Sequence, residues 1–164
     1  MIDFKKIEKF GIPALVIAAT LAGASSTQAY AAQGSRYEIN NGEVYDKDKN
    51  LTWQRCSLGQ NWKEGKGCEG TINTYTFQEA LQQAGTKWRL PTKDELSSLV
   101  DKSRPDFPAI DSETFPGMNE NVTGYWSNTP YNTERSWNVR FTSGIAADDI
   151  NVRRFGVRLV RSGK

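Results

Sequence analysis

The sequence predicts an α+β fold, in which antiparallel strands are combined with two helices. Strand-like patterns occur near residues 37–53 and again near residues 137–159, and two short amphipathic segments with helix-start signals lie between them. Because strands and helices are grouped rather than alternating, a doubly wound parallel sheet is not expected. The composition agrees, since 37% hydrophobic and 24% charged residues in a chain of 164 suit one globular domain.

The first 31 residues have the layout of a secretory signal peptide. Three lysines precede the apolar stretch Phe10–Ala24, and Ala29-Tyr30-Ala31 offers a small-residue cleavage site. The apolar stretch is shorter than the roughly twenty residues that a transmembrane helix needs. We therefore expect residues 1–31 to be removed and residues 32–164 to form a single domain with no membrane span. The mature protein should be exported, either to the periplasm or to the cell surface and medium.

The chain has two cysteines, Cys56 and Cys68, and no histidine. In an oxidising compartment, two cysteines in a small domain predict a disulfide, and the polar, glycine-containing segment between them can close as a surface loop. The absence of histidine excludes Ser-His and Cys-His catalysis and His-ligated metals. Two cysteines are also too few for a four-cysteine zinc or iron–sulfur site, so we expect neither metal nor cofactor.

Strands are expected at the start of the mature domain. Tyr37 and Ile39 precede the turn signal Asn40-Asn41-Gly42, and Val44-Tyr45 follows it. A second polar turn then leads into Leu51-Thr52-Trp53, which continues the β pattern.

Two helices are predicted from the spacing of their first residues. Thr76 with Glu79, and Thr92 with Glu95, each match a capping box. The apolar residues expected to face the core are Phe77, Ala80, Leu81 and Ala84 in the first helix, and Leu96, Leu99 and Val100 in the second.

After a Pro-rich loop at residues 103–121, the chain returns to strand-like alternation. Apolar and polar residues alternate over residues 137–141 and again over residues 154–159, with Thr142-Ser143-Gly144 as a turn. The first and last segments of the mature domain are both strand-like, so we expect these two terminal strands to pair. Trp88 and Trp126 are expected in the core.

Six strings in the chain resemble the Lcl C-terminal domain family, which is named after a collagen-like bacterial adhesin. They are YDKDKNLTWQ (45–54), FQEA (77–80), WRLPTKDEL (88–96), AIDSETF (109–115), YWSNTPY (125–131) and VRLVR (157–161). The resemblance covers about residues 40–162. It implies a C-type-lectin-like fold and an exported binding domain, which in the adhesin is associated with sulfated glycosaminoglycans. No collagen-like Gly-X-Y repeat occurs in this sequence, so trimerisation is not implied.

Calcium binding and catalysis are the alternatives that this resemblance raises. Calcium-dependent lectins use a Trp-Asn-Asp strand, but here Trp137-Asn138 is followed by Val139, and the nearby acidic residues are too few for a calcium ligand set. The distantly related formylglycine-generating enzymes use cysteines near the end of the fold, where this chain has none. Adjacent carboxylates elsewhere are more typical of helix caps and solvated loops, so we expect no catalytic residues.

Positive charge gathers at the end of the chain, where residues 135–164 contain seven basic and two acidic side chains. Strand alternation is expected to place Arg154 and Arg158 on one surface, with Arg140 on a neighbouring strand. Such a surface can bind sulfate or phosphate groups along a polymer, unless the arginines pair with acidic residues instead. After export, an anionic polysaccharide is a more plausible ligand than nucleic acid.

Trp62 lies among charged residues in the expected disulfide loop, where it can stack on a sugar or partner, or fold back onto the domain. The candidate ligand-binding residues are therefore Arg140, Arg154, Arg158 and Trp62. The expected function is that of an exported, non-catalytic, adhesin-like domain that binds anionic glycans or cell-surface polymers. The alternative is a periplasmic factor that binds a cell-envelope or secreted protein, as an inhibitor, immunity protein or secretion-system accessory does.

Overall fold

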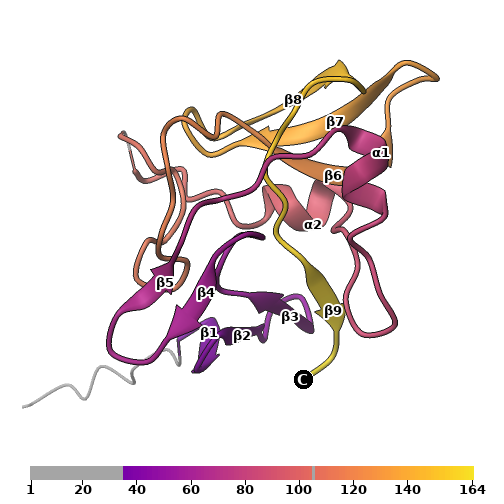
Figure 1. The fold of residues 1–164 in the computed structure, drawn as a ribbon. Helices are drawn as coiled ribbons and strands as arrows, with labels where there is room; N and C mark the ends of the chain where they lie inside the picture. The colour runs from indigo at the N-terminus through magenta and orange to yellow at the C-terminus, as the bar shows by residue number, and fades with distance from the viewer. Residues whose placement is uncertain (1–34, 105) are drawn as a thin grey trace, which may run out of the picture. The chain divides into compact units, whose positions relative to one another are not determined.

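The computed structural model describes residues 35–104 and 106–164, so the predicted signal peptide lies outside the described residues. These residues form antiparallel sheets and two short helices, which confirms the α+β fold (Figure 1). The elements in chain order are β1 (Tyr37–Asn40), β2 (Glu43–Asp46), β3 (Leu51–Gln54), β4 (Asn61–Lys63), β5 (Gly67–Glu69), α1 (Phe77–Leu81), α2 (Lys93–Ser97), β6 (Tyr125–Pro130), β7 (Arg135–Arg140), β8 (Ile145–Ile150) and β9 (Val160–Ser162).

The first sheet has the strand order β1-β2-β3-β9. The expected Asn-Gly turn joins β1 to β2, and Asn41 takes a positive φ of 51° there, a conformation that asparagine tolerates. The expectation that the terminal strands pair is wrong. Two hairpin connections place β1, β2 and β3 side by side, which leaves the outer edge of β3 for β9, with Trp53 opposite Val160.

The remaining strands form a three-stranded sheet, β6-β7-β8, and a separate hairpin of β4 and β5. Figure 1 shows the three-stranded sheet and the four-stranded sheet at opposite ends of the described unit, joined by the segment that runs from β8 down to β9. The β4–β5 hairpin follows β3 and projects beside the first sheet.

Both capping boxes are present as predicted. The hydroxyl of Thr76 accepts from the backbone N–H of Glu79, and that of Thr92 accepts from the N–H of Glu95, with each glutamate returning the hydrogen bond. Each helix is only five residues long, so the predicted apolar face of the first one is too long. Leu81 is 36% exposed and Ala84 lies beyond the helix end.

The core consists of two clusters of buried side chains. One lies under the first sheet and includes Trp53, Phe115 and Tyr125, whereas the other surrounds Trp126, which is fully buried as expected. The segment 155–160 lies between the clusters, because Phe155, Val157 and Leu159 belong to the second and Val160 to the first. This segment therefore has no solvent-facing side over most of its length.

The turn between Trp88 and α2 is fixed by an ion pair. Both guanidinium Nη atoms of Arg89 donate to Glu95, at 2.7 and 2.8 Å, and Glu95 also caps α2. These hydrogen bonds from Arg89 hold the pKa of Glu95 below its ordinary value of 4.5, against the opposing effect of burial. Because the folded-state pKa is lowered, the stabilisation is complete above pH 4.5 and is lost as the pH falls through the folded pKa.

We predict that Glu95→Gln lowers the free energy of unfolding by about 1–2 kcal/mol at pH 7, because the cap and the charged pair are both weakened. Acidification from pH 7 to pH 3 should then cost this variant less stability than it costs the original protein. Urea unfolding at several pH values measures both effects. Glu120→Gln, at an exposed position, is the matched control. Equal losses on acidification in the original protein and the Glu95 variant would contradict the prediction.

Candidate functional site

A cleft of about 790 Å³ opens beside the first sheet, between the β1–β2 turn, the chain that follows β3, and strand β4. Its aromatic residues are Trp62 and Trp88, and Leu58 adds an aliphatic side chain. Carboxamide side chains make up much of the remaining lining: Asn40, Asn41, Gln54, Gln60 and Asn61. A cleft of this size and composition is suited to a polar, uncharged or weakly charged ligand with apolar faces.

The β4–β5 hairpin carries Trp62 and is tied to the domain by the predicted disulfide. Cys56 and Cys68 are bonded, with their Cα atoms 5.4 Å apart, and Trp62 lies directly opposite Cys68 in the hairpin. The hairpin turn uses Gly65, whose positive φ of 73° favours glycine. The disulfide therefore fixes the position of Trp62 from the neighbouring strand.

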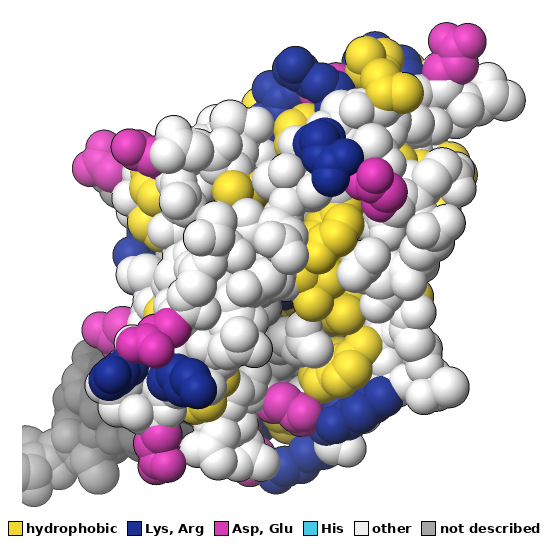
Figure 2. All heavy atoms as spheres, viewed as in Figure 1, with side chains coloured by type: hydrophobic (Ala, Val, Ile, Leu, Met, Phe, Trp, Pro, Cys, Tyr) yellow, Lys and Arg dark blue, Asp and Glu magenta, His cyan; other side chains and the backbone are white. Residues whose placement is uncertain are grey.

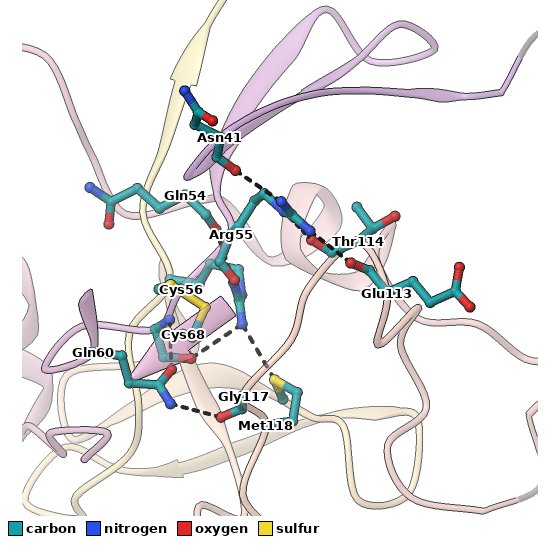
Figure 3. The surroundings of a disulfide bond; sticks show 12 residues. Asn41, Gln54, Arg55, Cys56, Gln60, Cys68, Glu113, Thr114, Gly117 and Met118 are labelled. Carbon is teal, nitrogen blue, oxygen red and sulfur yellow. Dashed lines mark hydrogen bonds between the residues drawn. A yellow bond between two sulfur atoms is a disulfide. The ribbon is translucent and has the colours of Figure 1, made fainter. Parts of the chain in front are cut away.

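Arg55 anchors Trp62 from the inside of the domain. Its guanidinium lies 4.1 Å from the centre of the indole ring, within the range of a cation–π contact. The same guanidinium donates to the carbonyl oxygens of Asn41, Glu113 and Thr114, at 2.8–2.9 Å (Figure 3). Its hydrogen bonds thus join the β1–β2 turn to the loop before β6, with Trp62 packed against the junction.

Gln60 and Gly117 hold the hairpin from the other side of the disulfide. The amide of Gln60 donates to the carbonyl of Gly117 at 3.0 Å, and its oxygen accepts from the backbone N–H of Ser57 at 3.3 Å (Figure 3). Gly117 has a φ of 76°, and a Cβ there would lie 2.8 Å from the Cβ of Cys68. Only glycine lets this loop approach the disulfide so closely.

Trp88 closes the other end of the cleft and is half-buried rather than fully in the core. The cations of Lys87 and Arg161 lie 5.2 and 5.6 Å from the centre of its ring, and both donate to the carboxylate of Glu43 at 3.0 Å. Burial alone would raise the pKa of Glu43, but the hydrogen bonds from these two cations outweigh it, and the pKa lies below its ordinary value. Glu43 is therefore an ionised carboxylate whose negative charge is balanced by Lys87 and Arg161.

A strip of partly buried apolar side chains continues from the cleft across the surface. Tyr75, Leu58 and Trp88 all pack against the second core cluster. The backbone places them in this order, because Tyr75 is bonded to Phe155, Leu58 to Val157, and the residue after Trp88 to Val160. Figure 2 shows a hydrophobic band on this face, with basic and acidic side chains at both of its ends.

Arg158 is not a surface residue, which corrects the expectation from strand alternation. It is fully buried and donates to the carbonyl oxygens of Gln54 and Arg55 and to the hydroxyl of Ser57. Its guanidinium lies 5.1 Å from the ring centre of Phe115. Alternation assumes one solvated face, but segment 155–160 lies between two core clusters, so the polar position faces protein on both sides.

Arg140 and Arg154 remain at the surface but are each engaged by an acidic residue. Arg140 contacts Asp149 at 3.1 Å, and Arg154 contacts Glu79 at 2.9 Å. Arg154 also donates to the carbonyl of Thr74. The three predicted arginines therefore do not form a shared basic surface, whereas the fourth predicted residue, Trp62, does line the cleft.

The carboxamide residues were missed by the sequence analysis. Asn40 and Asn41 were interpreted as turn residues, but only Asn41 lies in the turn, since Asn40 ends β1. Gln54 was quoted only as part of the family resemblance. The only available signal was that Gln60 and Asn61 directly precede Trp62, since an aromatic beside two carboxamides on an exposed hairpin favours polar ligand contacts.

Residues 35–104 and 106–164 contain no cluster of three or more Cys, Asp or Glu side chains that could hold a metal ion. In the same ranges no helix is long and apolar enough to cross a membrane.

The fold and the cleft define a small α+β domain with one internal disulfide and an open cleft lined by carboxamide side chains. The chain belongs to the Lcl C-terminal domain family, whose model matches residues 42–161. Membership in this family indicates a bacterial extracellular domain, and the disulfide is consistent with export. No curated protein matches the chain closely enough to count as a relative.

Proposed function

We propose that this protein is an exported, non-catalytic binding domain that recognises a cell-surface glycan through the cleft between Trp62 and Trp88. The observation that carries the proposal is the lining of this cleft, which combines carboxamides with two indole rings. Carboxamides both donate and accept hydrogen bonds, as sugar hydroxyls require. Aromatic rings offer apolar surface for the C–H faces of sugar rings.

Export is supported by the family and by the disulfide, which persists in oxidising compartments. The C-type-lectin-like fold implied by the family resemblance is part of the same proposal. The basic surface expected from the sequence contributes little to it, because its arginines are buried or paired with acids.

We predict that Trp88→Ala weakens glycan binding at least tenfold, which corresponds to about 1.4 kcal/mol. The original protein and the variant should be compared on an array of bacterial and host glycans, and then by titration with the best-bound glycan. Tyr131→Ala is the matched control, because Tyr131 is 55% exposed and does not line the cleft. Thermal unfolding verifies that both variants are folded.

Two outcomes would contradict the glycan proposal: no glycan bound by the original protein, or equal weakening by the Trp88 and Tyr131 substitutions. The first would favour the alternative of a protein-binding factor. One observation supports that alternative, namely the exposed aliphatic side chains of Ile145, Ile150 and Val152 on and after β8. Exposed apolar residues of this kind mark protein contacts when they are contiguous.

A further inference from the structure

We infer that the glycan segment held in the cleft is uncharged and several sugar units long. This inference rests on the proposed function and specifies its ligand. It differs from the anionic ligand that the sequence favoured, and it follows from the charges and unused hydrogen-bonding groups of the cleft and of the strip beside it.

The cleft offers no uncommitted cation to an anionic group. Glu43 is the one charged residue among its described lining residues, and both carboxylate oxygens already accept hydrogen bonds from Lys87 and Arg161. Arg55 lies behind Trp62 and donates inward to three backbone carbonyls. Sulfate and carboxylate groups are recognised by charge-assisted hydrogen bonds, and here the three cations that contact the two indole rings, Arg55, Lys87 and Arg161, are already engaged.

The carboxamides are available, in contrast. Gln60 is used to hold the loop at Gly117, but the side chains of Asn40, Asn41, Gln54 and Asn61 donate to and accept from no other group in the described part of the chain. Each supplies two donor hydrogens and one acceptor oxygen. Four such groups around one cleft can bond several hydroxyl or acetamido groups without any charge.

The strip indicates the length of the ligand. Backbone hydrogen bonds place Tyr75, Leu58 and Trp88 along the segment 155–160. The five residue steps from 155 to 160 span at most about 16 Å when extended. The ends of the strip are bounded by ion pairs, Arg154 with Glu79 near Tyr75 and Lys87 with Glu43 near Trp88. The surface is open along its length (Figure 2), so a chain of several sugar rings fits it better than a single sugar.

The test compares size-matched oligosaccharides by isothermal titration calorimetry at about 20 and 150 mM salt. The neutral probes are tetramers of N-acetylglucosamine and of glucose, with the corresponding single sugars. The anionic probes are heparin and hyaluronan tetrasaccharides. We expect a neutral tetramer to bind at least tenfold more tightly than its single sugar, with little change between the two salt concentrations.

Two substitutions sharpen the result. Asn61→Ala should weaken binding of the neutral tetramer about tenfold, whereas Asn128→Ala, at an exposed asparagine on β6 outside the cleft, should not. Glu43→Gln should release Lys87 and Arg161 and so create salt-sensitive binding of the heparin tetrasaccharide, which we do not expect of the original protein.

The inference is overturned, and the proposed function kept, if the original protein binds the anionic tetrasaccharides better than the neutral ones. Equal effects of the Asn61 and Asn128 substitutions would overturn the placement of the ligand. If no oligosaccharide binds and the glycan array is also empty, the inference and the proposed function fail together.

Discussion

Replacing Trp126 with alanine is expected to lower the free energy of unfolding by about 3–5 kcal/mol, as deletion of a fully buried aromatic side chain does. The indole has no exposed surface and packs edge-on against Phe155 and Phe77, with ring centres 4.8 and 5.5 Å away. Its N–H donates to the carbonyl of Tyr75 at 2.8 Å. The substitution therefore leaves a cavity beneath the apolar strip, and the carbonyl of Tyr75 keeps only its hydrogen bond from the backbone N–H of Phe155.

Urea unfolding followed by circular dichroism measures this loss. Tyr131→Ala provides the comparison, since an exposed aromatic should cost less than about 1 kcal/mol. A Trp126 variant as stable as the Tyr131 variant would show that the second core cluster does not hold the fold together. Because Tyr75 loses its hydrogen bond from the indole, ligand affinity should also fall in any Trp126 variant that remains folded.

Replacing both cysteines with serine is expected to lower the free energy of unfolding by about 2–5 kcal/mol. Cys56 follows β3 and Cys68 lies in β5, so the bond restrains the hairpin that carries Trp62. In the unfolded chain the same bond removes conformational freedom from the loop it closes, which contributes about 3 kcal/mol on the chain-entropy view.

The comparison requires the original protein in oxidised form, the same protein after reduction, and the double Cys56→Ser/Cys68→Ser variant. The reduced protein and the variant should unfold at similar, lower urea concentrations. Binding should weaken as well, because the contact of Trp62 with Arg55 and the hydrogen bond of Gln60 must then hold the hairpin in place without the disulfide. Unchanged stability after complete reduction would contradict the prediction.

The features that were predicted correctly are those set by residues close together in the sequence. Thr76 and Thr92 begin helices because each hydroxyl reaches a backbone N–H three residues later, and the Asn41-Gly42 turn forms within its own hairpin. The ends of the first helix could not be derived in the same way. Leu81 continues the apolar pattern, but the helix ends at that residue and the side chain is exposed.

The candidate site was predicted only in part, because its residues meet through contacts distant in sequence. Trp62 was singled out by its unusual place on a polar loop, whereas Trp88 joins it through the pairing of Arg89 with Val160. Arg158 was misplaced since nothing in its neighbourhood indicates that backbone carbonyls more than one hundred residues earlier would accept from it. Without knowledge of those carbonyl partners, an arginine that alternates with apolar residues is interpreted as a surface residue.

The pairing of β3 with β9 has a consequence for the order in which the domain can be assembled. Thr52 donates to the carbonyl of Gly163, 111 residues further along, and Trp53 lies opposite Val160. Ribosomes deliver β3 long before β9, so one edge of β3 stays unpaired while the intervening residues are made. Contacts this distant form late. The first sheet therefore cannot be completed until β9 has been made. A chain that is still incompletely folded can pass through a narrow channel, as the proposed export requires.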